Sequence, residues 1–315
     1  MAKGGKVTAQ ALLAKGEELV DQCQPELAIK FFQKAAAMEP NRSEIFDAIG
    51  ELATEIGDPD TAAQAFGRSI ELAPKSNPGK WLYFAQLVQG EESEKYTLQG
   101  IAYMKELMPA MPGIENTDES KLLRKQICDA YCSLGELYMS DLCDLDDAEA
   151  KCEFYLQEAM KYDMGLPEPT QALANLRLTQ QRKDDACACL DETYKRLGQC
   201  DENTMPSLEF RTFTGKMLIE VEKFEQACDV LEGVMQEDDE NPELWFLVGT
   251  CYKALEDYDS ALEFLERCES MLSKLKKEMG NEFHLDVQLD EVRALIASIN
   301  EIEPIEQADE DQDMD

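Results

Sequence analysis

The chain has 315 residues, of which 66 are Asp or Glu and 30 are Lys or Arg, giving a formal net charge of −36. An apolar fraction of 44% suffices for a folded core, which excludes a wholly disordered chain. So much negative charge repels nucleic-acid phosphates and anionic membrane surfaces. We therefore expect no direct nucleic-acid binding, no membrane binding, and partners that are basic.

The N-terminus and the cysteines favour a reducing compartment. The first residues lead into no apolar signal segment, and no stretch approaches 18 consecutive apolar residues. The 11 cysteines are odd in number and scattered rather than arranged as a disulfide framework. We expect free thiols and a protein of the cytoplasm and nucleus.

From residue 9 to residue 280 the sequence repeats one pattern of small and large apolar residues. Ala28 and Phe32 recur 34 residues later as Ala62 and Phe66. The pattern returns near the C-terminus as Trp245, Val248, Gly249, Tyr252, Ala261, Leu265 and Cys268. It resembles the tetratricopeptide repeat, in which each copy forms two antiparallel helices. The prediction is an all-α solenoid.

Small residues such as Gly50 and Ala62 are expected where the two helices of a hairpin touch, and large ones such as Phe66 between neighbouring hairpins. Because no hairpin can bury its apolar faces alone, the hairpins must stack. We count about seven, beginning near residues 9, 43, 78, 128, 167, 208 and 242. The third is expected to have a long inter-helix turn around residues 90–94, and a connecting segment is expected at 111–118.

A different pattern follows the repeats. Residues 281–300 are predicted to hold a capping helix, from about Phe283 to Ile299, because apolar residues recur there at a helical period. An open-ended solenoid needs such a cap. Residues 301–315 carry no basic residue and are expected to be a disordered acidic tail, and residues 1–8 a flexible N-terminus.

Catalysis and metal binding have little support in the sequence. His284 is the only histidine and is expected to begin the capping helix as a solvated side chain. Cys128 and Cys132 lie four residues apart, but no second cysteine pair at matched spacing completes a zinc site. Cys152 and Cys268 occupy repeat positions of small apolar residues, so they are expected in the core. We expect no enzyme, no cofactor and no metal.

The acidic residues of the first helices are the candidate binding site. In this architecture the first helix of each hairpin lines a concave groove, and its residues away from the repeat signature point inward. Apolar residues of the same helices would add contact area. A solvated surface in a very acidic protein is the alternative interpretation. The predicted groove residues are Glu17, Asp21, Glu44, Asp47, Glu51, Glu55, Leu82, Asp129, Glu136, Met139, Glu168, Leu178 and Phe246.

One known tetratricopeptide class does not fit these residues. Proteins that dock the acidic C-terminus of a heat-shock chaperone hold it with a clamp of Lys, Asn and Arg. Here Glu17 follows Lys15 and Gly16 at the place resembling the Asn, and Asp47 and Glu51 replace the polar and basic residues of the second hairpin. This groove would repel an acidic peptide, so no binding of the carboxylate-clamp kind is expected.

The runs at residues 172–182 and 96–101, with the acidic tail after a capping helix, resemble the family of dedicated assembly chaperones for large-subunit ribosomal protein four. The resemblance covers nearly the whole chain. It implies that the concave face captures a long basic loop of the newly made ribosomal protein and shields it until the protein joins the pre-ribosome. The alternative is a tetratricopeptide scaffold of some other complex.

Overall fold

The structure, a computed structural model, describes residues 8–108, 117–201, 204–280 and 283–302. Over these ranges it contains fifteen helices and no strand. The chain forms two compact units, unit 1 (Met1–Ala172) and unit 2 (Leu173–Asp315). Within the described ranges, no helix combines the length and apolar character needed to cross a membrane.

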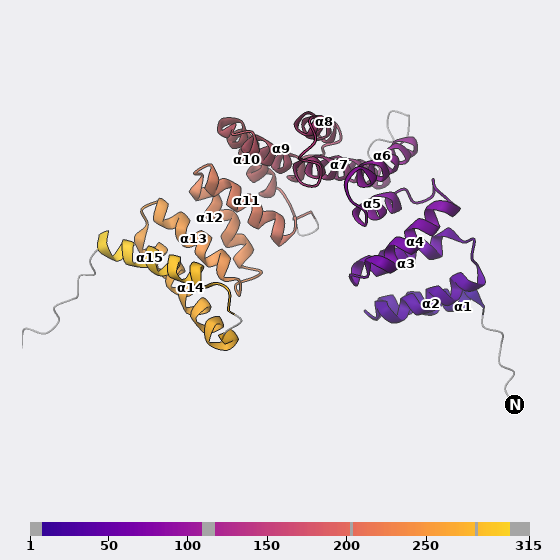
Figure 1. The fold of residues 1–315 in the computed structure, drawn as a ribbon, viewed down its shortest axis with the longest axis horizontal. Helices are drawn as coiled ribbons and strands as arrows, with labels where there is room; N and C mark the ends of the chain where they lie inside the picture. The colour runs from indigo at the N-terminus through magenta and orange to yellow at the C-terminus, as the bar shows by residue number, and fades with distance from the viewer. Residues whose placement is uncertain (1–7, 109–116, 202–203, 281–282, 303–315) are drawn as a thin grey trace, which may run out of the picture. The chain divides into compact units, whose positions relative to one another are not determined.

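The helices follow one another as pairs, and the members of a pair lie side by side (Figure 1). Helix α9 spans the boundary between the two units. Unit 1 contains α1 (Ala9–Asp21), α2 (Pro25–Met38), α3 (Ser43–Glu55), α4 (Pro59–Leu72), α5 (Gly79–Gln86), α6 (Gly90–Leu107), α7 (Asp118–Met139), α8 (Ala148–Met160) and the start of α9 (Glu168–Thr179). Unit 2 continues with α10 (Lys183–Leu197), α11 (Leu208–Glu220), α12 (Phe224–Met235), α13 (Pro242–Ala254), α14 (Tyr258–Met279) and α15 (Asp286–Ile302). The prediction of seven hairpins and a capping helix is confirmed.

Most hairpins close with the same turn. A residue with left-handed backbone follows the first helix by two positions, so the chain reverses and the second helix starts at once. At Gly57 (φ 72°) the missing Cβ makes this conformation easy. The other four turns accept it without glycine, at Cys23, Gln181, Glu222 and Glu256.

Small residues lie where paired helices touch, as the repeat pattern predicts. A Cβ added to Gly50 would lie 2.7 Å from the ring of Phe66, and one added to Gly135 would lie 2.6 Å from Leu156. Both large partners are fully buried. Phe66, predicted to lie between neighbouring hairpins, packs against Gly50 within its own hairpin and also stacks on Tyr83 of the next one. The alternation of small and large residues therefore sets the distance between the two helices of a hairpin.

The sixth hairpin permits a matched test of this packing. We predict that Gly215→Ala lowers stability by about 1–3 kcal/mol through overpacking, because its Cβ would lie 2.6 Å from the buried side chain of Leu231. In Gly233→Ala, on the partner helix, the Cβ meets nothing within 4 Å. That control should be neutral or gain roughly 0.5–1 kcal/mol from helix propensity. Urea unfolding followed by circular dichroism measures both, and equal effects would contradict the prediction.

Two predictions about the middle of unit 1 are wrong. The turn around residues 90–94 is not long, because α6 begins at Gly90 and these residues form its first turn. The fourth hairpin begins well before residue 128, because α7 starts at Asp118 and the side chain of Thr117 caps it. Of the predicted connecting segment, residues 111–116 lie outside the described residues.

The capping helix α15 packs on α14. Leu289, Val292 and Ile299 are buried in a core that also contains Leu265 and Leu272. The helix is three residues shorter at its start than predicted, so His284 precedes it rather than beginning it. Two predicted boundaries are wrong by one or two residues, because Thr8 caps α1 and α15 continues to Ile302. The rest of the predicted flexible N-terminus (1–7) and of the predicted acidic tail (303–315) lies outside the described residues.

Candidate functional site

Helix α3 carries three exposed carboxylates, Glu44, Glu51 and Glu55, which we call the α3 acidic ridge. Partial burial raises the pKa of Glu51 above its ordinary value, and the neighbouring carboxylates of Asp47 and Glu55 raise it further. The amide of Asn77 opposes this rise by donating a hydrogen bond to Glu51 Oε1 at 3.4 Å. Arg42 lies 3.9 Å from Glu44 at the start of the helix, so within the described ranges the unpaired negative charge of the ridge lies at Glu51 and Glu55.

Asp47 differs from its neighbours on α3. It is only 6% exposed, and its Oδ1 lies 4.0 Å from Nζ of Lys80, whose side chain is fully buried. Burial raises the pKa of Asp47 and lowers the pKa of Lys80. Contrary to the prediction, the carboxylate of Asp47 therefore does not lie free on the groove surface.

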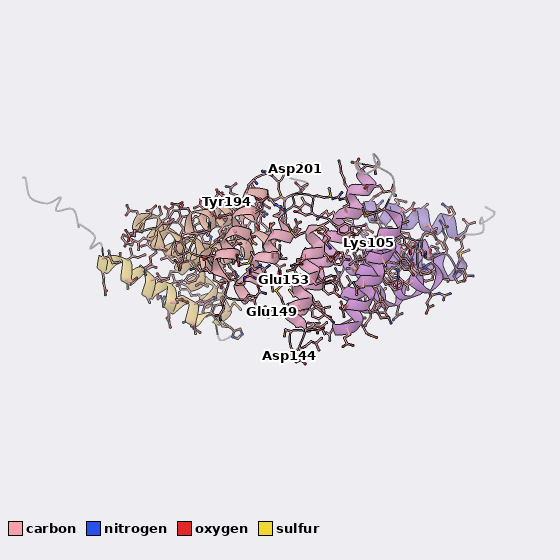
Figure 2. All side chains as sticks on the ribbon, turned by 90° about the horizontal axis from the view of Figure 1, so that it is seen from above. Lys105, Asp144, Glu149, Glu153, Tyr194 and Asp201 are labelled. Atoms are coloured by element: carbon pink, nitrogen blue, oxygen red, sulfur yellow. The ribbon has the colours of Figure 1, made fainter. Side chains whose placement is uncertain are left out.

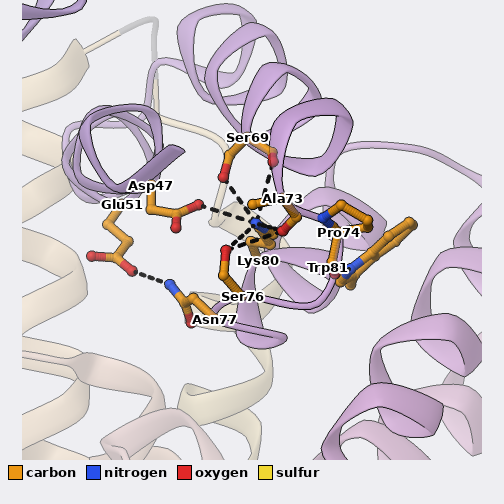
Figure 3. Close-up of polar contacts among 9 residues, drawn as sticks. All are labelled: Asp47, Glu51, Ser69, Ala73, Pro74, Ser76, Asn77, Lys80 and Trp81. Carbon is orange, nitrogen blue, oxygen red and sulfur yellow. Dashed lines mark hydrogen bonds and ion pairs between the residues drawn. The ribbon is translucent and has the colours of Figure 1, made fainter. Parts of the chain in front are cut away.

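Lys80 also caps the end of α4 (Figure 3). Its ammonium donates to the carbonyl of Ala73 at 2.6 Å and to the carbonyl and hydroxyl of Ser69 at 3.3 and 3.0 Å. The next residue, Trp81, donates from Nε1 to the carbonyl of Pro74 at 2.8 Å. The third hairpin thereby satisfies carbonyls at the C-terminal end of the second.

A second group of predicted residues meets in a cavity of about 360 Å³ bounded by α5, α6 and α7, which we call the α5–α7 groove. Leu82 of α5 and Asp129 and Glu136 of α7 all line it. Asp141, just beyond α7, adds a third carboxylate, which the repeat pattern does not predict. The structure thus brings together three predicted residues from two hairpins.

A lysine interrupts the acidic residues at the edge of this groove. Lys125 Nζ lies 3.2 Å from Asp129 Oδ2 and 3.5 Å from Glu168 Oε1. Burial raises the pKa of Asp129, and Lys125 opposes that rise. Glu136 has no such partner, because no Lys or Arg within the described ranges lies at ion-pair distance. Its side chain is exposed, but the protein atoms around it reduce its solvation and so raise its pKa. The sequence shows Lys125 four residues before Asp129, a spacing that favours such a pair.

The remaining predicted residues lie elsewhere. Glu17 and Asp21 are exposed on α1. Met139 is half-buried at the end of α7 and does not line the α5–α7 groove. Leu178 and Phe246 belong to unit 2, where they are half-buried against its two apolar cores. All nine predicted carboxylates belong to unit 1.

One repeat position shows how the two units differ. The residue after the small contact residue of each first helix is Glu17, Glu51, Gln86 and Glu136 in unit 1, and Asn175, Lys216 and Thr250 in unit 2. Lys216 forms an ion pair with Glu243 at 2.7 Å. Aligning the hairpins on this residue would have revealed the difference from sequence.

Acidity alone does not distinguish the first helices. Asp144, Glu149 and Glu153, in the α7–α8 turn and on α8, show that carboxylates also occur on the second-helix side (Figure 2). Within the α3 acidic ridge and the α5–α7 groove, desolvation raises the pKa of three carboxylates, Glu51, Asp129 and Glu136. Such carboxylates gain more from an incoming cation than fully solvated ones do.

The structure shows where the cysteines and the single histidine, as possible metal ligands, lie. All 11 cysteines are free thiols, and Cys152 and Cys268 are buried in the core as predicted. Among the described residues, no group of three or more His, Cys, Asp or Glu side chains is placed to hold a metal ion.

Comparisons with known proteins agree with this architecture. A tetratricopeptide-repeat profile matches residues 218–268. A protein of Schizosaccharomyces pombe described as "Probable assembly chaperone of rpl4" is 34% identical over 257 residues, 78% of this chain and 74% of that protein. Its counterpart in Emericella nidulans, described in the same words, is 27% identical over 286 residues, 83% of this chain and 70% of that protein.

Solved structures share the fold. The structure of "Assembly Chaperone of RpL4 (Acl4)" superposes with a TM-score of 0.69 at 24% identity, covering 80% of this chain and 98% of that one. The Cut9 complex with Hcn1 superposes with a TM-score of 0.51 at 13% identity, covering 84% of this chain and 46% of that one. Both likenesses support the solenoid assignment.

Proposed function

Since the chain belongs to the family of assembly chaperones of rpl4, a non-enzymatic class, we propose that it binds the basic extended loop of newly made ribosomal protein four and shields it until that protein joins the pre-ribosome. The binding surface is the first-helix side of unit 1, centred on the α3 acidic ridge. The chaperone accompanies its client from the cytoplasm into the nucleus.

The observation that supports this proposal most directly is the electrostatic state of the α3 acidic ridge. No lysine or arginine of the described residues lies within ion-pair distance of Glu51 or Glu55. Burial and like charge raise the pKa of Glu51, so its charged form is held at a cost in the free protein. A basic segment removes that cost when it binds, whereas an acidic or neutral one does not.

The same charges explain capture and release. A surface of one sign attracts an oppositely charged segment from a distance and speeds its encounter. Ribosomal RNA has a denser negative charge than this surface, so it competes for the same basic loop. Release at the pre-ribosome then needs no other energy source.

The salt dependence of binding tests the proposal. We expect the affinity of the full chain for purified ribosomal protein four to fall at least about tenfold between 50 and 300 mM NaCl, because the ions screen an electrostatic contact. A client lacking its basic loop is the control and should bind weakly, with little response to salt. Tight, salt-independent binding of both clients would instead favour a scaffold with an apolar contact surface. Isothermal titration calorimetry provides the affinities.

A further inference from the structure

The α5–α7 groove is chemically different from the α3 acidic ridge. The ridge is an open row of carboxylates, whereas the groove is a cavity of about 360 Å³ with walls from three helices. Cavities of this size accommodate a ligand or a large side chain. The groove can therefore hold a side chain between three helices, with one side open to solvent.

The lining of the groove combines an apolar surface with carboxylates. Leu82, Val88 and Leu137 contribute aliphatic side chains, and Asp129 and Glu136 contribute carboxylates. The hydroxyl residues Ser93 and Ser133 also line it. This combination matches a side chain with an aliphatic stem and a cationic end.

Charge favours a cation as the occupant. Glu136 has no lysine or arginine within ion-pair distance among the described residues, and desolvation raises its pKa. Lys125 forms ion pairs with Asp129 and Glu168 at the edge of the groove. In the part of the chain that the structure describes, no Lys or Arg lines the groove itself. A bound cation would supply the partner that Glu136 lacks.

The geometry favours arginine over lysine. Asp129 and Glu136 are seven residues apart on α7, or about 10 Å along the helix axis. A single ammonium group interacts with one carboxylate there, whereas a guanidinium presents five donors to a carboxylate and neighbouring hydroxyl groups together. Guanidinium is also less strongly hydrated than ammonium, so it enters a partly apolar groove at a lower cost.

We propose that the α5–α7 groove holds one arginine side chain of the basic client segment, with the stem on Leu82, Val88 and Leu137 and the guanidinium at Glu136. This inference rests on the proposed function and deepens it. The ridge supplies long-range attraction, and the groove fixes the register of the bound segment at one residue.

The first test is a substitution that fills the groove. Its effect is measured on the binding of the full chain to purified ribosomal protein four. Ser133 is exposed and lines the groove, so Ser133→Trp fills the cavity without changing the charge. We expect its affinity to fall about tenfold. Leu122→Trp is the matched control on α7, because Leu122 is 57% exposed and does not line the groove. It should change the affinity less than about twofold.

A double-mutant cycle provides the second test. Glu136→Gln should weaken binding, and replacing the client's arginines singly by methionine should identify one whose loss has no further effect in this variant. Coupling to a lysine instead would overturn the assignment to arginine. If the wild type binds normally and Ser133→Trp binds equally well, the groove does not hold a client side chain, and the proposed function still stands. Absence of wild-type binding would overturn both.

Discussion

Replacing Glu44, Glu51 and Glu55 together by lysine should weaken binding of ribosomal protein four at least about 100-fold, since opposed like charges cost several kcal/mol. All three side chains are exposed on α3, so the exchange leaves the core untouched. It reverses three charges along the α3 acidic ridge, including that of Glu44, which lies 3.9 Å from Arg42. Calorimetric titration at low salt, where screening is weakest, gives the largest difference.

The control for this prediction changes the same charge elsewhere. Glu26, Asp60 and Glu71 are exposed on the second helices α2 and α4. Their replacement by lysine should reduce the affinity only slightly, through the change in net charge. Both variants should keep the helical circular dichroism of the wild type. An equal loss in the two variants would mean that net charge, and not the ridge, binds the client.

Replacing Lys80 by methionine should lower the free energy of unfolding by about 3 kcal/mol, the cost typical of breaking a buried ion pair. The methionine leaves the buried carboxylate of Asp47 without its cation and removes hydrogen bonds to the carbonyls of Ser69 and Ala73. Urea denaturation measures the loss. A change below about 0.5 kcal/mol, the range of ordinary surface substitutions, would contradict it.

A second variant separates the ion pair from the helix cap. Asp47→Leu combined with Lys80→Met removes both charges, so it should be less destabilised than Lys80→Met alone. The cap on α4 is lost in both variants. The difference between their free energies of unfolding therefore measures the cost of leaving the Asp47 carboxylate buried without its cation. Lys75→Met is the matched control, because Lys75 is exposed and its pair with Glu106 at 2.7 Å lies in solvent. It should change stability little.

The hairpins could be predicted from sequence because the contact that defines them is local. A small residue such as Gly50 and a large one such as Phe66 recur at a fixed spacing, and the structure places them against each other. The start of α7 could not be predicted in this way. It depends on the side chain of Thr117, which caps the helix, and a helix cap leaves no trace in an apolar period.

The candidate site was predictable only in part. Glu44, Glu51 and Glu55, which the helical spacing predicts to face the groove, are exposed on α3. The same spacing predicts that Asp47 lies beside them. Asp47 is buried beside Lys80 of the next hairpin. The apolar pattern within one helix cannot predict a contact with a residue of another hairpin. Asp141 could not be predicted for a related reason, since it lies beyond the end of α7 and the repeat pattern describes only the helices.

The position of Lys80 has a consequence for how the chain is made. Translation proceeds from the N-terminus, so α3 and α4 leave the ribosome before the lysine that completes them. Until α5 emerges, the carbonyls at the end of α4 lack their ammonium donor and Asp47 lacks its cation. The second hairpin therefore reaches its full stability only after the beginning of the third has been synthesised. Because the α3 acidic ridge lies on the second hairpin, its folding is completed only when elongation has passed Lys80.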